Sequence, residues 1–232
     1  MGKISMPGIV SKLVAPVAGI QAVTLAVGSI VKLRENGTPV NYIVVNQGIP
    51  GGSSLYDASC DGTWLLRQTI LKSTVWSAGK TNKYSTSAIK QLSMPSFDPE
   101  VKSVIKTVKI PFCDGGGNST VLSGANGYSC QAFLLSGYEI GLTNGPVQNF
   151  PLDGSKLSYF SFGEFDSKRI ANGNWWTRSP YILGGNTLQA VLANTSGGYG
   201  IPEVSNSNGI RPALILPSDV LFDDNMNFMG VP

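Results

Sequence analysis

Apolar positions in this chain occur in short runs separated by polar, glycine-rich stretches. Runs at 29–33 and 41–45 flank Asn36-Gly37, and an Asn-Gly pair between two apolar runs predicts a β-hairpin. Residues 63–70 fit a strand or a short helix equally well, because their apolar positions follow neither period clearly. The other short runs predict strands at 106–112, 131–135, 175–178, 188–192 and 210–216.

Two helices are expected among these strands. Ser85 or Thr86 can cap a helix that continues through Leu92. Asp98-Pro99-Glu100 combines a capping residue, a proline at the first position and an acidic first turn, which predicts a helix to about Ile105. Helices that are segregated from an antiparallel sheet define the α+β class, which is the predicted fold class.

The C-terminal third shows the strongest contrast along the chain. Strands at 175–178, 188–192 and 210–216 are predicted to form one scaffold sheet, whereas 182–208 is rich in Gly, Asn, Ser and Thr. A rigid apolar frame around a polar, irregular middle is typical of a surface that binds a ligand. The tail at 219–232 is expected to be a short surface extension.

Four large residues of this frame are assigned structural roles. Trp175 and Trp176 are adjacent on a strand, so their side chains point to opposite faces, and we expect one in the core and the other partly exposed. Arg178 and Arg211 lie in apolar strands, where an arginine usually pairs with a buried carboxylate or with loop carbonyls. The candidate carboxylate partners are Glu139, Asp153 and Asp166.

Residues 13–31 contain no charged side chain. Such a run can indicate a membrane span or, behind two lysines, a secretory signal peptide. A proline and two glycines within the run argue against a span. The favoured interpretation divides the chain into an apolar arm at 1–27, buried against a partner, and a ligand-binding domain at 28–232.

The composition excludes several kinds of chemistry. The chain has no histidine, which rules out Ser-His-Asp and Cys-His catalytic pairs and removes the commonest metal ligand. The net charge of +3, without any basic run longer than two residues, argues against nucleic-acid binding. Cys60, Cys113 and Cys130 are isolated, which favours free thiols, although a bridge between Cys113 and Cys130 stays open.

The remaining candidates for chemistry are weak. Asp153, Glu164 and Asp166 are carboxylates that glycoside hydrolysis could use, but their spacing singles out no pair. Residues 223–225 could ligate Ca²⁺, yet a solvated turn explains them more simply. Residues 115–117 lack the lysine of a phosphate-binding loop. We therefore predict no enzyme activity, no metal and no cofactor.

A resemblance rests on motifs at both ends of the frame. These are Trp-Trp-Thr-Arg-Ser-Pro at 175–180 and Gly-Ile-Arg-Pro-Ala-Leu at 209–214, with further segments at 41–48, 55–66, 109–111 and 133–141. In order and spacing, about 27–218 resembles the C-type-lectin-like variable proteins of diversity-generating retroelements in Firmicutes phages and gut bacteria. The resemblance implies a C-type-lectin-like fold: an antiparallel sheet with two helices and long irregular loops. Formylglycine-generating enzymes resemble this fold too, but their paired catalytic cysteines have no match here.

The resemblance also implies a function. It points to an exposed receptor-binding protein of a phage tail that contacts a host-surface protein or glycan through a diversified region at about 174–210. Its partners would be copies of itself joined through the N-terminal arm, with a trimer guessed, and other virion tail proteins, without nucleic acid or membrane insertion. A bacterial surface or secreted adhesin is the alternative, and an enzyme that modifies glycan or protein is a weaker one. The expected ligand contacts are Thr177, Tyr181, Ile182, Leu183, Asn186, Leu188, Gln189, Asn194, Tyr199, Ile201, Glu203, Asn206 and Asn208.

Overall fold

The structure is a computed structural model that describes residues 19–79, 81–92, 94–115, 120–183 and 187–232. The fold is mostly β, with 36% of residues in strands and 13% in helices, arranged in several separate sheets. The prediction of an α+β, C-type-lectin-like fold is therefore wrong. Pro95 follows the first predicted helix, and a run rich in β-branched residues at 105–110 follows the second, so neither helix extends and strands and loops build the domain.

Both predicted helices exist but are short. Helices α1 (Ile89–Leu92) and α2 (Pro99–Val104) contain four and six residues. Helix α2 begins after Asp98 as predicted, but the Asp98 carboxylate does not cap the helix. It accepts hydrogen bonds from Arg34 Nε at 3.1 Å and from the Gly37 N–H at 2.7 Å. The 3₁₀-helices in the described residues are η1 (Ala22–Thr24), η2 (Pro50–Gly52), η3 (Ala58–Cys60), η4 (Tyr84–Thr86), η5 (Gly124–Asn126) and η6 (Ser167–Arg169).

A five-stranded antiparallel sheet, here called the central sheet, has the strand order β10-β15-β4-β3-β2. Asn36 and Gly37 join β2 to β3 with φ angles of 48° and 75°, as a tight hairpin turn requires, which confirms the predicted hairpin. Residues 63–67 form a strand, which settles the choice between strand and helix. The strands are β2 (Ile30–Glu35), β3 (Thr38–Gln47), β4 (Thr63–Arg67), β10 (Ala132–Phe133) and β15 (Ala213–Leu216).

The central sheet separates two apolar cores. In β3, Tyr42 and Val44 face the smaller core beneath α2, whereas Ile43 and Val45 face the larger one. This is the alternation that a strand imposes on successive side chains. Because both faces are covered, the middle residues of the strands are apolar at successive positions, as in Tyr42–Val45 and Trp64–Leu66, and β4 consequently has no readable period in the sequence.

A second five-stranded sheet, the frame sheet, has the order β13-β12-β11-β14-β5. Strands β11 and β12 lie in one sheet as predicted, and they pair antiparallel. The prediction that 210–216 joins them as a single strand is wrong: β14 ends at Ile210, and the chain then crosses to the central sheet as β15. Pro212 lacks an N–H donor and stands at this crossing. The strands are β5 (Lys72–Val75), β11 (Trp175–Leu183), β12 (Thr187–Ala193), β13 (Tyr199–Gly200) and β14 (Ser207–Ile210).

The two ends of the described chain meet in a three-stranded sheet of order β1-β16-β17. Residues 20–25, which the prediction placed in the arm, belong to the fold, because β1 pairs with β16 and Ala22 and Leu25 are buried. The tail is not a surface extension either, since Phe222 lies in the smaller core. These strands are β1 (Ile20–Gln21), β16 (Leu221–Phe222) and β17 (Phe228–Gly230). The rest of the arm, 1–18, lies outside the described residues.

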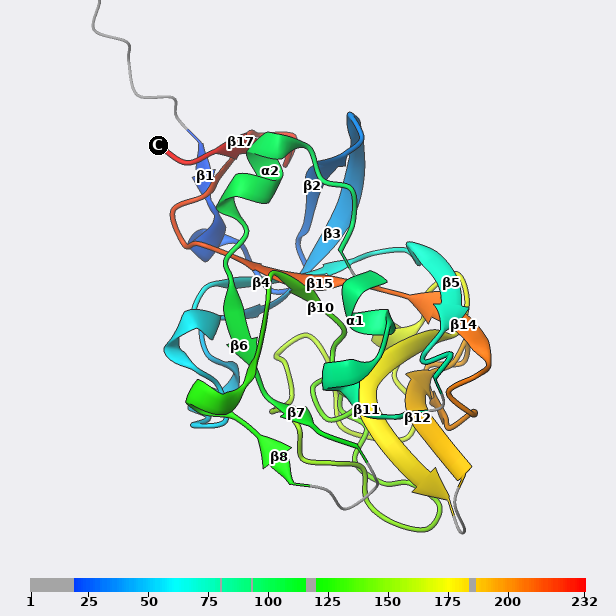
Figure 1. Cartoon of the computed structure of the whole chain (residues 1–232). Coiled ribbons are helices and arrows are strands. Elements are labelled where there is room, and N and C mark those ends of the chain that lie inside the picture. The colour runs from blue at the N-terminus through cyan, green and yellow to red at the C-terminus, as the bar shows by residue number, and fades with distance from the viewer. Residues whose placement is uncertain (1–18, 80, 93, 116–119, 184–186) are drawn as a thin grey trace, which may run out of the picture.

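The terminal strands and α2 lie at one end of the molecule, and β11 and β12 lie at the other (Figure 1). Two short strand pairs and long loops fill the space beside the frame sheet. None of the three cysteines forms a disulfide in the described part of the chain, so the alternative bridge between Cys113 and Cys130 is not formed. The paired strands are β6 (Val108–Ile110) with β9 (Tyr128–Cys130), and β7 (Phe112–Cys113) with β8 (Val121–Leu122).

Candidate ligand-binding surface

Both tryptophans of the frame are fully buried. Trp175 Nε1 donates to the Arg169 carbonyl at 2.8 Å, and Trp176 Nε1 donates to the Thr74 carbonyl at 3.0 Å. The two side chains do point to opposite faces, but the frame sheet is covered on both, so the expectation that one tryptophan is partly exposed is wrong. Full burial is compatible with the structural role that was predicted for both tryptophans.

Arg178 lies at the centre of a buried polar cluster. Its Nη1 and Nη2 donate to Oε2 and Oε1 of Glu139, each at 2.6 Å, in a bidentate ion pair that is 0% exposed on both sides. The other donors reach the carbonyl oxygens of Pro111, Leu134 and Asp153, each at 2.8 Å. Every N–H of the guanidinium is therefore used, and the arginine joins four separate segments.

Glu139 is itself held by its own turn. The Ser136 N–H donates to Glu139 Oε2 at 2.9 Å, and the Glu139 N–H donates back to Ser136 Oγ at 3.0 Å. This reciprocal pair is the arrangement of a capping box. The Tyr56 hydroxyl also donates to Oε1 at 2.8 Å. Of the three carboxylates predicted as partners of the frame arginines, Glu139 is thus the one that pairs with Arg178.

Asp153 is the second buried carboxylate of the cluster. Ser179 Oγ lies 3.0 Å from Oδ1 and 2.9 Å from Oδ2, so a single hydroxyl proton serves both oxygens. Ser179 Oγ also accepts from the Gly137 N–H at 2.8 Å. Burial raises the pKa of Asp153 from 3.8 to about 6, although the charge of Arg178 and the Ser179 hydroxyl lower it in part.

This shift predicts a pH-dependent stability. A carboxyl group whose pKa is raised by folding stabilises the fold below its unfolded pKa of 3.8, and that contribution is lost as the pH rises through about 6. A shift of about two pKa units corresponds to about 3 kcal/mol, so Asp153 should lower the free energy of unfolding by about that amount between pH 4 and pH 7. Urea unfolding at several pH values measures this change.

Asp153→Asn provides the control for that measurement. An amide accepts the Ser179 hydroxyl without ionising, so the difference in unfolding free energy between wild type and variant should track pH over this window. A difference that stays constant from pH 4 to pH 7 would contradict the assignment.

Arg211 forms no carboxylate pair among the described residues. Its Nε donates to the Arg67 carbonyl at 2.8 Å, and its guanidinium lies 5.1 Å from the centroid of the Trp175 ring. Burial lowers the pKa of Arg211 to about 10. The cation–π contact and the carbonyl join the crossing after β14 to both sheets, which agrees with a structural role.

Arg169 was not singled out from the sequence, yet it organises the loops that border the frame sheet. Its side chain is fully buried and donates only to backbone carbonyls. The acceptors are Ile140 at 2.7 Å, Gly197 at 2.8 Å, Ser161 and Gly163 at 3.0 Å and Glu164 at 3.3 Å. No local sequence signal distinguishes it from a surface arginine, because all its partners are carbonyls brought together by the fold.

Three residues predicted as ligand contacts lie in the interior instead. Thr177 and Tyr181 are 0% exposed and Gln189 is 9% exposed. Thr177 Oγ1 donates to the Val191 carbonyl at 2.8 Å. A register shift between Trp176 and Pro180 interrupts the pairing of β11 with β12. The contact prediction is wrong for these three side chains, which pack against the core rather than face solvent.

Tyr181 nevertheless shapes the surface from below. Its hydroxyl lies 3.2 Å from the N–H groups of both Val147 and Gln148 and 3.3 Å from the Gln148 carbonyl. The Phe150 ring packs edge-on against it, with centroids 5.5 Å apart. Tyr181 therefore anchors the 143–150 loop to the frame sheet.

Five of the predicted contacts line an open groove of about 740 Å³, here called the Tyr199 groove. Its wall is built from β12, β13, the segment 201–206, the first residues of β14 and the residue before β11, and none of the described residues that line it is charged. The groove therefore offers a ligand neutral amide groups, the Ser207 and Tyr199 hydroxyls and half-buried apolar groups. The lining residues are Asn174, Leu192, Asn194, Tyr199, Gly200, Ile201, Pro202, Asn206, Ser207 and Asn208.

Asn194 is part of the groove but its side chain holds the turn between β12 and β13. Its Oδ1 accepts from Ser196 N, Ser196 Oγ and Gly198 N, and its Nδ2 donates to the Tyr199 carbonyl at 3.0 Å. Gly197 in this turn has a φ of 81°, and a Cβ there would lie 2.3 Å from the Asp166 carbonyl oxygen. The turn is therefore a fixed element of the groove.

The remaining predicted contacts that the structure describes do not line this groove. Ile182 and Leu188 are half-buried and face each other across β11 and β12. Glu203 is exposed. Leu183 and Asn186 were also predicted as contacts, but the Leu183 side chain and the whole of Asn186 lie outside the described residues.

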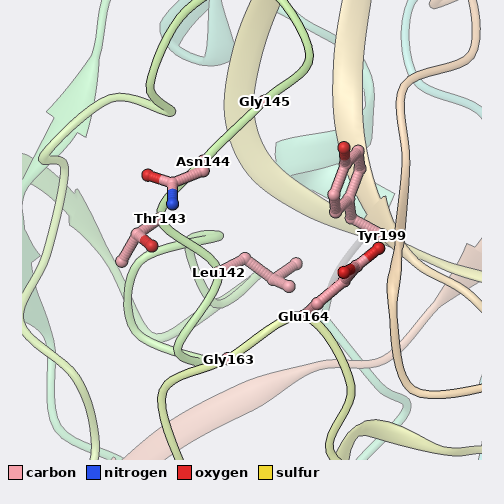
Figure 2. Close-up of a pocket in the computed structure, with 7 residues that line it drawn as sticks. All are labelled: Leu142, Thr143, Asn144, Gly145, Gly163, Glu164 and Tyr199. Carbon is pink, nitrogen blue, oxygen red and sulfur yellow. The ribbon is translucent and has the colours of Figure 1, made fainter.

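A second recess, the Glu164 pocket, is also lined by Tyr199 and has a volume of about 240 Å³. Figure 2 shows the Glu164 side chain extended toward Tyr199, with Thr143 and Asn144 across the pocket beyond Leu142. Among the described residues, the side chains of Thr143, Asn144, Glu164 and Tyr199 have no hydrogen-bond partner or ion pair. The pocket is lined by Leu142, Thr143, Asn144, Gly145, Gly163, Glu164 and Tyr199.

Sequence reasoning missed most of this pocket. Thr143, Asn144 and Gly145 belong to a loop more than fifty positions before Tyr199, and only the fold brings them together. Tyr199 lines both recesses, and the edge of the Phe150 ring packs against it with centroids 5.2 Å apart and an interplanar angle of 82°. The two recesses therefore share one aromatic ring, which Phe150 holds in place.

The carboxylates considered for catalysis do not share a site. Glu164 lines the pocket, whereas Asp153 is buried beside Ser179, and Asp166 accepts hydrogen bonds from the N–H groups of Ser161 and Lys168. The described part of the chain contains no group of three or more His, Cys, Asp or Glu placed to hold a metal ion. No helix among the residues described is long and apolar enough to cross a membrane.

Fold and site together define a mostly-β protein with a polar surface beside the frame sheet, in which Glu164 is the charged side chain among the described lining residues. Residues 61–218 match the family described as Domain of unknown function (DUF6273), and the chain belongs to that family. The matched part begins two residues before β4 and ends two residues after β15, so it includes both recesses. No curated protein and no solved structure matches the chain.

Proposed function

We propose that this protein is a receptor-binding protein of a phage tail, and that the Tyr199 groove and the Glu164 pocket contact a host-surface ligand. The observation that carries the proposal is the set of described polar side chains around Tyr199 that have no hydrogen-bond partner, beside a strand whose Thr177, Arg178 and Ser179 side chains are all hydrogen-bonded. Rigid aromatic anchors combined with adaptable Asn, Ser and Gly contacts are the chemistry of binding surfaces. A bacterial surface adhesin would use the same surface on a different carrier.

The proposal limits which positions of 174–210 are suited to diversification. Tyr199, Ile201, Glu203, Asn206 and Asn208 are exposed or half-buried, so replacing them changes the surface at small cost to the core. The buried positions 177, 181 and 189 cannot vary freely, because each substitution would leave a cavity or an unpaired polar group. The diversified set is therefore expected to be smaller than the full segment.

Neighbouring DNA tests diversification directly. A reverse-transcriptase gene and a near-copy of the 3′ coding segment, differing mainly at adenines, would support it. If the gene has neither of these and lies outside any phage module, diversification is contradicted. The binding surface is then tested only by the cell-binding experiment.

Association through the N-terminal end is part of the same proposal. Val23, Val27, Ile30, Met229 and Val231 are between 38% and 52% exposed and belong to η1, the strands at this end and their flanks. Exposed apolar groups of this kind favour contact with another chain. Several copies would offset weak single-site affinity through multivalency. Light scattering should report a homo-oligomer, a trimer in our proposal, and a monomer at micromolar concentration would contradict it.

Replacing Tyr199 with alanine is expected to reduce binding to intact host cells by about 10-fold or more, because the variant removes the ring shared by both recesses. The measurement is flow cytometry of the fluorescently labelled full chain on a panel of Gram-positive gut bacteria. Lys102→Ala, on the exposed side of α2 at the far end of the molecule, is the matched control and should bind as wild type. Equal binding by the Tyr199 variant would exclude this surface as the contact site.

A further inference from the structure

The lining of the Glu164 pocket indicates the class of ligand. Glu164 is its only charged side chain, and no arginine or lysine side chain lines it. An anionic group such as a phosphate or a carboxylate would face the Glu164 carboxylate without a cation to pair with, which is unfavourable. The pocket chemistry therefore disfavours acidic ligands.

The positive charge of the buried Arg169 lies close to the negative charge of Glu164. The buried Arg169 guanidinium donates to the carbonyl oxygens of Gly163 at 3.0 Å and of Glu164 at 3.3 Å, so a positive charge lies directly beneath the backbone of the pocket. A cationic ligand would be attracted by the Glu164 carboxylate but repelled by the Arg169 guanidinium beneath it. The two charges largely compensate, which favours a neutral ligand.

The size of the pocket and its hydrogen-bonding groups narrow the ligand further. Its volume of about 240 Å³ lies below the range of about 300–1,000 Å³ that holds drug-sized molecules, so it suits a single ring. Glu164 accepts hydrogen bonds, Asn144 both donates and accepts, and the Thr143 and Tyr199 hydroxyls do either. Adjacent hydroxyl groups on one ring match such a mixed set of donors and acceptors.

An aromatic ring completes this chemistry. Tyr199 presents an electron-rich face, which attracts the polarised C–H bonds of a sugar ring. Phe165 is 65% exposed and lies beside Gly198 in the turn next to Tyr199, so a second ring stands close to the pocket. The neutral Tyr199 groove continues from the same tyrosine and offers Asn206, Ser207 and Asn208 to further hydroxyl groups.

We infer that the Glu164 pocket binds one neutral sugar residue of a surface glycan, and that the Tyr199 groove binds the residues that follow it. This inference rests on the proposed function and names the ligand class of its contact surface. A free monosaccharide should bind weakly in the pocket, and affinity should rise with chain length as the groove fills.

The test uses the full chain against an array of neutral glycans, acidic glycans and peptides, followed by titration calorimetry with neutral mono-, di- and trisaccharides. We expect neutral glycans to bind, with affinity rising from mono- to trisaccharide. Tyr199→Ala and Asn144→Ala should each weaken binding about 10-fold, and Lys102→Ala should leave it unchanged. Asn206→Ala with Asn208→Ala should remove the gain from chain length and spare monosaccharide binding.

Glu164→Gln separates a neutral from a cationic ligand. An amide still accepts a hydrogen bond from a sugar hydroxyl, so we expect a loss of less than about 10-fold and little effect of salt. A loss of about 100-fold that is steeply salt-dependent would identify a cationic ligand and overturn the inference. Exclusive binding of acidic glycans or of peptides would overturn it as well.

The cell-binding experiment keeps this inference distinct from the proposed function. If cells bind in a Tyr199-dependent manner but no neutral glycan does, the sugar assignment fails and the contact surface stands. If neither cells nor glycans bind, both fail. Thermal unfolding of each variant checks that it is folded, and Asn144→Ala, an exposed loop change, supplies the pocket test should Tyr199→Ala not fold.

Discussion

Replacing Arg178 with methionine is expected to destabilise the fold by about 3–5 kcal/mol, because removing one partner of a buried ion pair leaves the other charge uncompensated. Glu139 would keep the Ser136 N–H and the Tyr56 hydroxyl but lose both guanidinium contacts. The carbonyls of Pro111, Leu134 and Asp153 would lose their donor in the same substitution. Urea unfolding followed by tryptophan fluorescence measures the change.

Arg34→Met is the matched control for this prediction. Arg34 also pairs with a carboxylate, since its Nε lies 3.1 Å from Asp98 Oδ2, but its side chain is 55% exposed. Exposed pairs contribute about 0–1 kcal/mol, so this variant should stay within about 1 kcal/mol of wild type. Similar losses for the two variants would mean that burial does not decide the strength of the Arg178 pair.

Replacing Arg169 with methionine is expected to cost about 3–5 kcal/mol and to abolish ligand binding. Five carbonyl oxygens lose their donor, and each buried polar group left without a partner costs about 1–3 kcal/mol before the loops relax toward water. Because Gly163, Glu164 and Gly197 are among those acceptors, both recesses should lose their shape. Unfolding measures the first effect, and the cell-binding assay measures the second.

Lys168→Met tests the neighbouring position. Lys168 is exposed, and its Nζ lies 5.1 Å from the Tyr159 ring centroid, a contact worth about 0.5–1 kcal/mol at an exposed site. This variant should lose less than about 1 kcal/mol and bind as wild type. A variant of Arg169 that is destabilised yet binds normally in the folded state would show that its hydrogen bonds do not shape the recesses.

The sequence predicted those features well that depend on interactions between neighbouring residues. The Asn36-Gly37 turn, the start of α2 at Pro99 and the presence of 175–178 and 188–192 in one sheet were all predicted and are confirmed. Arg178 was predicted to pair with a buried carboxylate or with loop carbonyls, and it does both, because desolvating a guanidinium without partners is costly wherever it occurs. The choice among the three candidate carboxylates required the fold.

The polar middle of the frame was harder to interpret. Composition placed Thr177, Tyr181 and Gln189 with the surface residues, although all three are buried. Their burial depends on the interrupted pairing after Trp176 and on the loops that cover the frame sheet. Neither feature produces a periodic pattern of apolar residues in the sequence. Asn194 was expected to contact ligand, whereas its side chain is used within its own turn.

What the sequence by itself determined about this protein is its local geometry and the chemistry it lacks. Tight turns, strand-forming runs and the absence of histidine follow from residue types and short spacings alone. The tertiary structure decided which faces are covered, which carboxylate pairs with Arg178, and that Thr143 and Asn144 stand opposite Tyr199. Those outcomes depend on contacts between residues far apart in the chain, whose partners no local pattern specifies.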